Sequence, residues 1–185
     1  MANFSIDTFT SQLSQGGALA SLFECKVTGW SGISDVEGSQ NQWIFMCNGA
    51  TLPPSTITPA TVTYMGRALQ IPGNRDAAQL VTNIYNDENM EIRATIENWM
   101  EKLNSHKTNK RALGMQRILD YTGTLTVEQL SKTDVGATKM YSFINAWPSA
   151  IGEITVDWET NDIQTYDVTW EFSYWRSNQC NTGFS

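Results

Sequence analysis

The stretch Ile163-Gln164-Thr165-Tyr166-Asp167-Val168-Thr169-Trp170-Glu171-Phe172-Ser173-Tyr174-Trp175 decides the fold. From Tyr166 to Tyr174, apolar and aromatic residues alternate strictly with polar and acidic ones. Successive side chains of a β-strand point to opposite faces, so this period of two predicts one long strand with a buried face. We therefore expect its aromatic side chains in the core and its acidic side chains at the surface.

Other stretches also favour strands, because β-branched and aromatic residues pack well across a sheet. The predicted strands are 22–28, 43–48, 60–64, 68–71, 80–85, 124–130, 138–145 and 154–158. We expect 43–48 to pair with 22–28. Met65-Gly66-Arg67 is expected to join 60–64 to 68–71 as a hairpin that Pro72-Gly73 ends. The sequence thus predicts a mainly β fold, an antiparallel β-sandwich or barrel.

One amphipathic helix is predicted after the strand at 80–85. Asn86 or Asp87 is expected to cap its N-terminus, because either side chain accepts hydrogen bonds from the first free backbone amides. Its apolar face has helical spacing and carries Ile92, Ile96, Trp99, Met100 and Leu103. We expect this face to pack against the sheets, with Trp99 in the core.

The stretch 102–117 is the most basic part of the chain. It holds five of the twelve Lys and Arg residues, together with His106, the one histidine. Such a charge run predicts an exposed loop. Two interpretations stay open, a solvated connection and a docking surface for a partner protein.

The length of 185 residues fits one domain, 1–185, with an N-terminal arm at 1–20 and a loose tail at 176–185. We predict neither a membrane span nor a secretory signal, because no long apolar run and no basic leader occur. The three cysteines have no close pairing motif, which favours buried thiols in a reducing compartment.

The charge of the chain argues against one class of function, tight binding of nucleic acid. The formal net charge is −7, which argues against a protein that grips the phosphates of nucleic acid tightly. Only 17% of the residues are charged, a low share that fits large buried interfaces between subunits.

Catalytic, cofactor and metal sites are not predicted. With one histidine and no Cys-x-x-Cys or phosphate-binding loop, the chain lacks the motifs of metal sites, nucleophilic catalysis and nucleotide binding. A glycosidase-like site is the sharper enzymatic alternative, because carboxylates lie among aromatics, namely Asp157, Glu159, Asp162, Asp167 and Glu171 among Trp158, Trp170, Tyr174 and Trp175. The alternation of the strand favours a polar face and a core face instead.

Four segments carry a resemblance. The first three are Phe45-Met46-Cys47-Asn48-Gly49-Ala50-Thr51-Leu52-Pro53, then Tyr64-Met65-Gly66-Arg67 with Gly73-Asn74-Arg75, then Val81-Thr82-Asn83-Ile84-Tyr85-Asn86-Asp87-Glu88 followed by Arg93 and Trp99. The fourth, most specific segment runs from Ala146-Trp147-Pro148 through Gly152-Glu153, Asp157-Trp158 and Gln164-Thr165-Tyr166-Asp167-Val168-Thr169 to Tyr174-Trp175. In order and approximate spacing they resemble the tail tube proteins of contractile-tailed, T-even-like bacteriophages.

The resemblance implies a sandwich or barrel of antiparallel strands with one flanking helix. It also implies six-membered rings that stack into a tube inside a contractile sheath, through which duplex DNA passes without tight binding. The protein would then be a virion structural protein of the phage tail, assembled in the host cytoplasm. Its partners would be other copies of itself, the tail sheath protein, and the baseplate and tail terminator proteins, with no membrane.

Two sets of site residues follow as hypotheses. Stacking between subunits is assigned to hairpin residues Thr58, Val62, Tyr64, Arg67 and Arg75. Docking of the sheath is assigned to Lys107, Lys110 and Arg111.

Three alternatives to a phage tail tube stay open. The same fold could build the tube of a bacterial contractile injection device or type VI secretion system, which carries protein and no packaged DNA. A minor component at the end of the tube is the second. A Trp-rich carbohydrate-binding or glycoside-cleaving β-domain is the third, and a glycan array or a hydrolysis assay would detect it.

Overall fold

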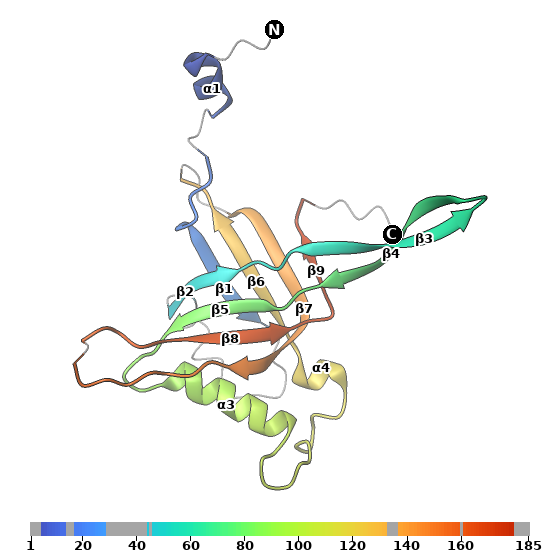
Figure 1. Cartoon of the computed structure of the whole chain (residues 1–185). Helices are drawn as coiled ribbons and strands as arrows, with labels where there is room; N and C mark the ends of the chain where they lie inside the picture. The colour runs from blue at the N-terminus through green and yellow to red at the C-terminus, as the bar shows by residue number, and fades with distance from the viewer. Residues whose placement is uncertain are drawn as a thin grey trace.

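The structure is a computed structural model that describes residues 5–13, 17–28, 44, 46–132, 137–159 and 161–179. Its helices are α1 (Ile6–Gln12), α3 (Glu91–Leu103) and α4 (Ile118–Tyr121). Its strands are β1 (Phe23–Thr28), β2 (Cys47–Thr51), β3 (Ser55–Tyr64), β4 (Arg67–Ala77), β5 (Leu80–Tyr85), β6 (Gly123–Leu130), β7 (Ala137–Ile151), β8 (Thr165–Glu171) and β9 (Tyr174–Ser177). The mainly β fold with one flanking helix is confirmed (Figure 1).

The main sheet is antiparallel and has the order β1-β6-β7-β8-β5-β2, with β9 also paired to β7. The long strand β7 pairs with β6 and also with two further strands at different parts of its length. Its residues 141–144 pair with β9, and its residues 147–151 pair with β8. Between them Asn145 has a φ of 56°, a left-handed conformation that Asn tolerates better than most residues. This break lets one strand pass from one half of the sheet to the other.

The sheet curls until its two outer strands, β1 and β2, contact each other. The buried thiols of Cys25 and Cys47 lie at this seam, and both are reduced. A hydrogen bond with the Cys25 thiol lowers the pKa of the Cys47 thiol, although burial opposes that shift. Because no ladder joins β1 to β2 within the described residues, the barrel stays open there.

The core lies between the curled sheet and α3. Ile92, Ile96 and Trp99 are the buried face of α3, as its helical spacing predicts. The indoles of Trp99 and Trp170 pack with their ring centroids 5.8 Å apart. Each indole N–H is satisfied: Trp99 Nε1 donates to the carbonyl oxygen of Tyr121 at 2.9 Å, and Trp170 Nε1 donates to Thr82 Oγ1 at 2.9 Å.

The decisive stretch forms two strands instead of one. Tyr166, Val168 and Trp170 are buried along β8, which confirms the predicted core face. The chain then leaves β8, because the backbone N–H of Ser173 donates to the carbonyl oxygen of Ile144 and β9 pairs with the other half of β7. Tyr174 is consequently 54% exposed, although the period of two continues through it.

The predicted pairing of 22–28 with 43–48 and one predicted strand are wrong. β1 pairs with β6, whereas β2, the strand predicted at 43–48, pairs with β5. β2 begins at Cys47, and residues 43 and 45 lie outside the described residues. The predicted strand at 154–158 is absent, because 152–157 has no regular structure and the chain there forms the loop between β7 and β8.

Two predicted boundaries also need correction. The helix begins at Glu91 with Met90 as its cap residue, at φ 54°, and without a side-chain cap. Asn86 is engaged elsewhere, since its side-chain amide donates to Gln164 Oε1 at 3.0 Å. The hairpin does not end at Pro72-Gly73, because β4 continues to Ala77.

The two ends of the chain take part in regular structure within their described residues. The arm at 1–20 contains α1, which stands away from the sheets in Figure 1. Arg176 and Ser177 belong to β9, so regular structure extends two residues into the tail predicted at 176–185. No helix in the described part of the chain has the length and apolar character needed to cross a membrane.

Candidate functional site

The hairpin of β3 and β4 is a two-stranded sheet that projects from the body of the subunit (Figure 1). Every residue from 55 to 77 is exposed, including the large apolar residues Ile57, Val62, Tyr64, Met65, Leu69 and Ile71. An isolated hairpin is only marginally stable in water, because it lacks a core. This surface therefore has the character of an interface that another molecule covers.

The five predicted stacking residues all lie on this hairpin. Thr58 Oγ1 donates to Asp76 Oδ2 at 3.0 Å, which links the two strands near the base. Tyr64, which is 72% exposed, faces Arg67 in the register at the tip. Val62 and Arg75 also lie along the exposed strands. The structure gathers these residues on one projection, and their role in stacking stays a prediction.

Gly73 fits a close approach between the two strands. The register of the hairpin shifts between Ile57 and Pro59, and Gly73 lies against Thr58 at that bulge. A Cβ atom at position 73 would lie 2.5 Å from the carbonyl oxygen of Thr58, a backbone atom that cannot move aside locally. Glycine in a strand commonly marks such a bulge.

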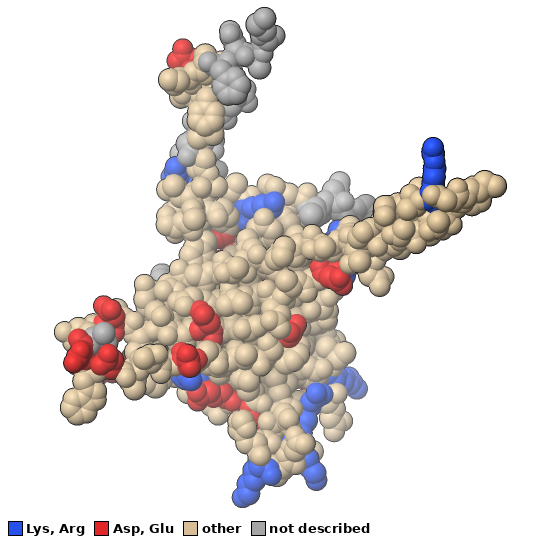
Figure 2. All heavy atoms as spheres, viewed as in Figure 1, with Lys and Arg blue, Asp and Glu red and all other residues tan. Residues whose placement is uncertain are grey.

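A second projection is the loop 153–163, which we call the acidic loop. It carries Glu153, Asp157, Glu159 and Asp162 and contains no Lys or Arg. Figure 2 shows acidic side chains gathered at the end of this projection, on the left of the view. The sequence predicts a strand at 154–158 and considers the acids of this loop only for a glycosidase-like site, although four carboxylates without a cation also indicate a charged surface.

The acids and aromatics of the glycosidase alternative do not form one group. Trp170 is buried in the core, whereas Trp158 is fully exposed on the acidic loop. On the opposite face of β8, Asp167 Oδ1 accepts a hydrogen bond from Asn83 at 2.6 Å, and Glu171 accepts one from Gln79. These acids and aromatics are therefore divided among the core, the surface of the sheet and the loop. The separation of core and surface along β8 is the one that the alternation of the strand predicts.

Lys102 and Leu103 of the basic stretch 102–117 belong to the last turn of α3, and the rest of the stretch forms the predicted loop after the helix. Lys107, Lys110 and Arg111 are all exposed, and basic side chains cluster at the lower end of the molecule in Figure 2. The Arg111 guanidinium lies over the Tyr121 ring, 4.4 Å from its centroid. Met115, only 3% exposed, fixes the loop to the core. Sheath docking by these residues stays a prediction.

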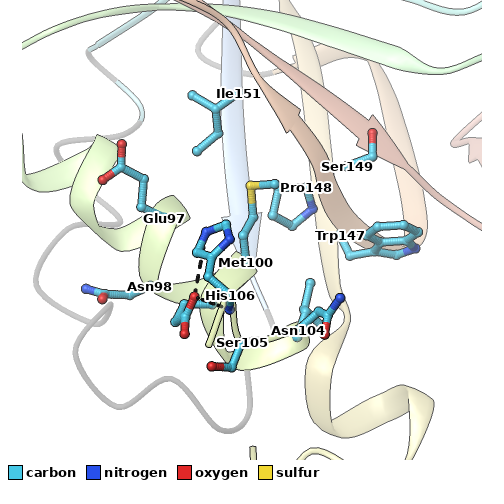
Figure 3. A pocket seen from close by; sticks show the side chains of 12 residues that line it. Glu97, Asn98, Met100, Asn104, Ser105, His106, Trp147, Pro148, Ser149 and Ile151 are labelled. Atoms are coloured by element: carbon cyan, nitrogen blue, oxygen red, sulfur yellow. Dashed lines mark hydrogen bonds and ion pairs between the residues drawn. The ribbon is translucent and has the colours of Figure 1, made fainter. Parts of the chain in front are cut away.

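A groove of about 710 Å³ runs between α3 and β7 (Figure 3). Its apolar wall includes Met100, Trp147 and Pro148, with His106 at its rim. The exposed imidazole Nε2 of His106 lies 3.7 Å from Glu101 Oε2. Hydrogen bonds from Ser105 and from the backbone N–H of His106 lower the pKa of the Glu101 carboxyl.

Among the described residues, the His106 imidazole is paired with the exposed carboxylate of Glu101, and no hydrogen bond joins it to a serine or cysteine side chain that could act as a nucleophile. In the part of the chain that the structure describes, no three His, Cys, Asp or Glu side chains come together as metal ligands.

Known proteins with similar sequences are phage tail tube proteins. The family model of the phage tail tube protein matches residues 17–178. Tail tube protein gp19 of Enterobacteria phage T4 is 26% identical over 132 residues, which cover 71% of this chain and 79% of gp19. The tail tube protein of Serratia phage KSP90 is 23% identical over 163 residues, covering 86% and 89% of the two chains.

The fold is also found in a solved structure, the sheath–tube complex of the extracellular contractile injection system PVC in its extended state. One chain of that complex aligns with a TM-score of 0.62 at 13% identity, covering 91% of this chain and 96% of its own length. Because the tail tube family model spans most of the sequence, the chain belongs to the phage tail tube protein family and is a structural subunit of the tail tube in a contractile phage virion.

Proposed function

We propose that six copies of the chain close a ring and that successive rings stack into the tube. The observation that carries this proposal is the hairpin 55–77, which is exposed along its whole length despite its apolar residues. In addition, β1, β2 and β9 each pair along one edge only among the described residues, and ring closure offers neighbours for such edges. Electron microscopy of the purified protein tests the proposal, and six-membered rings are the expected particles.

Stacking of the rings is assigned to the hairpin and to its residues Thr58, Val62, Tyr64, Arg67 and Arg75. Burial of the apolar side chains in the next ring would supply the free energy that an isolated hairpin lacks. Because the hairpin is paired internally, it can be inserted or withdrawn without opening the main sheet. Nothing in this assembly requires catalysis, and we propose that the chain has none.

The negative net charge supports the proposal that duplex DNA passes through the tube without binding to its wall. Six copies at −7 give about −42 formal charges per ring, and the part of that charge that faces the lumen repels phosphates. Duplex DNA should then slide through the tube without adhering to it. We expect assembled tubes to show no binding of duplex DNA at physiological salt in a sedimentation assay. Submicromolar binding that weakens steeply with added salt would contradict a repulsive lumen.

The partners of the tube are proposed to be the sheath, the baseplate and the tail terminator. The solved structures that share this fold include a sheath–tube complex, a sheath and tube terminator, and a baseplate. Those descriptions concern the other proteins, and for this chain they support a tube that contacts the same classes of component.

Neutral replacement of Lys107, Lys110 and Arg111 by glutamine is expected to leave the fold and the tubes intact. Exposed charges typically contribute less than about 1 kcal/mol each to stability. If these residues dock the sheath, polymerisation of sheath protein around triple-variant tubes should fall. Turbidity and microscopy of mixed tube and sheath measure this effect, with the wild-type tube as control. Unchanged sheath polymerisation would leave the loop as a solvated connection.

A further inference from the structure

The hairpin and the acidic loop lie at opposite ends of one ladder. β5 and β8 pair from Leu80–Trp170 at one end to Tyr85–Thr165 at the other. Two residues separate the end of the hairpin at Ala77 from Leu80, and one residue separates the end of the acidic loop from Thr165. Figure 1 shows the two projections extending in opposite directions, to the right and to the left of the body. The subunit therefore has two distinct ends along these strands.

The acidic loop is held at its base and exposed at its tip. At one base Arg93 Nη1 donates to the carbonyl oxygen of Gly152 at 3.3 Å, and the N–H of Gly152 donates to the carbonyl oxygen of Asp167 at 2.6 Å. At the other base, the N–H of Asn86 donates to the carbonyl oxygen of Gln164 at 2.8 Å. These contacts fix where the loop leaves the sheet, so its tip is presented from a defined position.

The tip combines an apolar centre with negative charge. Val156, Trp158 and Ile163 are 76%, 104% and 70% exposed, which is unusual for such large apolar side chains in a chain that acts alone. In sequence, the four carboxylates of the loop flank Val156 and Trp158, and Asp162 directly precedes Ile163. A hollow of about 330 Å³ opens between the two arms of the loop, lined by side chains that include Glu153, Val156 and Asp162. Exposed Trp residues of this kind commonly act as anchors of an interface.

The tip of the hairpin is complementary to this surface. Tyr64 and Met65 are 72% and 87% exposed at the turn, and Arg67 follows them. The hairpin 55–77 carries two arginines and one aspartate, so its net charge is positive, opposite to that of the acidic loop. Figure 2 shows a basic side chain near the end of this projection. Both surfaces thus present aromatic and aliphatic groups beside charges of opposite sign.

We propose that the acidic loop of one copy receives the hairpin tip of a second copy in the next ring. Trp158 would pack against Tyr64 and Met65, and the Arg67 guanidinium would lie among the carboxylates of Asp157 and Glu159. This inference rests on the proposed stacking through the hairpin and names its receiving surface. A contact between two different surfaces on identical subunits is heterologous, so it repeats without closing and builds a filament.

Charge complementarity also gives the stack its polarity. Hairpin tips and acidic loops attract each other, whereas two acidic loops repel. Rings added in the reverse orientation would place like charges together. The contact would therefore bind neighbouring rings together and also favour their head-to-tail orientation.

A charge exchange tests the inference. Arg67→Glu alone, and Asp157→Lys with Glu159→Lys alone, are each expected to leave rings intact and reduce the fraction of rings in tubes at least tenfold. Combining the three substitutions restores the opposite signs and should restore tubes, a rescue that a merely disordered loop would not show. Sedimentation and electron microscopy measure rings and tubes separately. Trp158→Ala is expected to shorten tubes without any change of charge.

The matched control combines the loop reversal with Lys107→Glu, which places the same new charge on the basic loop. This combination should not restore tubes. If it does, or if tubes of normal length form with the reversed acidic loop, the receiving surface proposed here is wrong. Failure of the Arg67→Glu combination to rescue tubes would overturn it as well. Failure of the wild-type chain to form rings would instead contradict the proposed function.

Discussion

Replacing Trp99 with alanine is expected to lower the free energy of unfolding of the subunit by about 3–5 kcal/mol, a large part of the stability of an ordinary domain. Trp99 is 1% exposed and joins α3 to the sheet through its contact with Trp170. Truncation would leave a cavity there and would remove the indole N–H that satisfies the carbonyl oxygen of Tyr121. Subunits should then fold poorly and form few rings.

Denaturant unfolding of the subunit under conditions that prevent assembly measures this loss. The matched control is Trp158→Ala, because Trp158 has the same side chain but is fully exposed. Its effect on unfolding should stay within about 0.5 kcal/mol, as for most surface substitutions. A cost below about 1 kcal/mol for Trp99→Ala would mean that α3 is not a structural part of the core.

The second large effect is expected from Gly73→Val, which should abolish tubes while leaving the main sheet folded. A Cβ atom at this position would clash with the backbone of Thr58, and a branched side chain cannot avoid the clash. The two strands of the hairpin would separate at the bulge, so the tip would no longer be presented. The hairpin forms a sheet of its own, so the damage should not spread to the core.

Circular dichroism and the unfolding midpoint should remain those of the wild type, while sedimentation should show rings without tubes. Ala77→Val provides the control, because it introduces the same side chain as Gly73→Val at another exposed position on β4. Tubes of normal length from the Gly73→Val protein would show that the hairpin does not carry the stacking.

The sequence predicts best those elements whose pattern is local. β5 matches its predicted range 80–85, and β6 differs by one residue, because alternation identifies both the strand and its buried face. The face of α3 follows in the same way from its helical spacing. Alternation does not identify the neighbouring strand, however. β1 pairs with β6 about 100 residues away, a choice that depends on how the whole sheet curls.

Two incorrect predictions show that local sequence patterns do not identify tertiary contacts. The alternation from Tyr166 to Tyr174 is unbroken, because β8 and β9 share the same period although they pair with different halves of β7. At the start of α3, Asn86 has the right chemistry for a cap. It bonds to Gln164 across the sheet instead, a tertiary contact that no helix signal contains.

The sequence predicts the turn of the hairpin but not the full extent of the candidate assembly surfaces. The turn at Met65-Gly66 was evident, but the exposure of the whole hairpin was not, because its Ile, Val and Leu residues have the composition of a buried strand. The acidic loop was predicted as a strand from Ile154 and Val156. Its fixed bases and the exposure of Trp158, on which the proposed contact rests, are visible only in the three-dimensional structure.

Assembly of the subunit into a tube is the central claim, and electron microscopy of the purified full-length chain at increasing concentration tests it most directly. The account predicts six-membered rings that stack head to tail into tubes, with density for the hairpin crossing from each ring to the next. A population that remains monomeric at high concentration, or rings that stack without any density between hairpin and acidic loop, would contradict it.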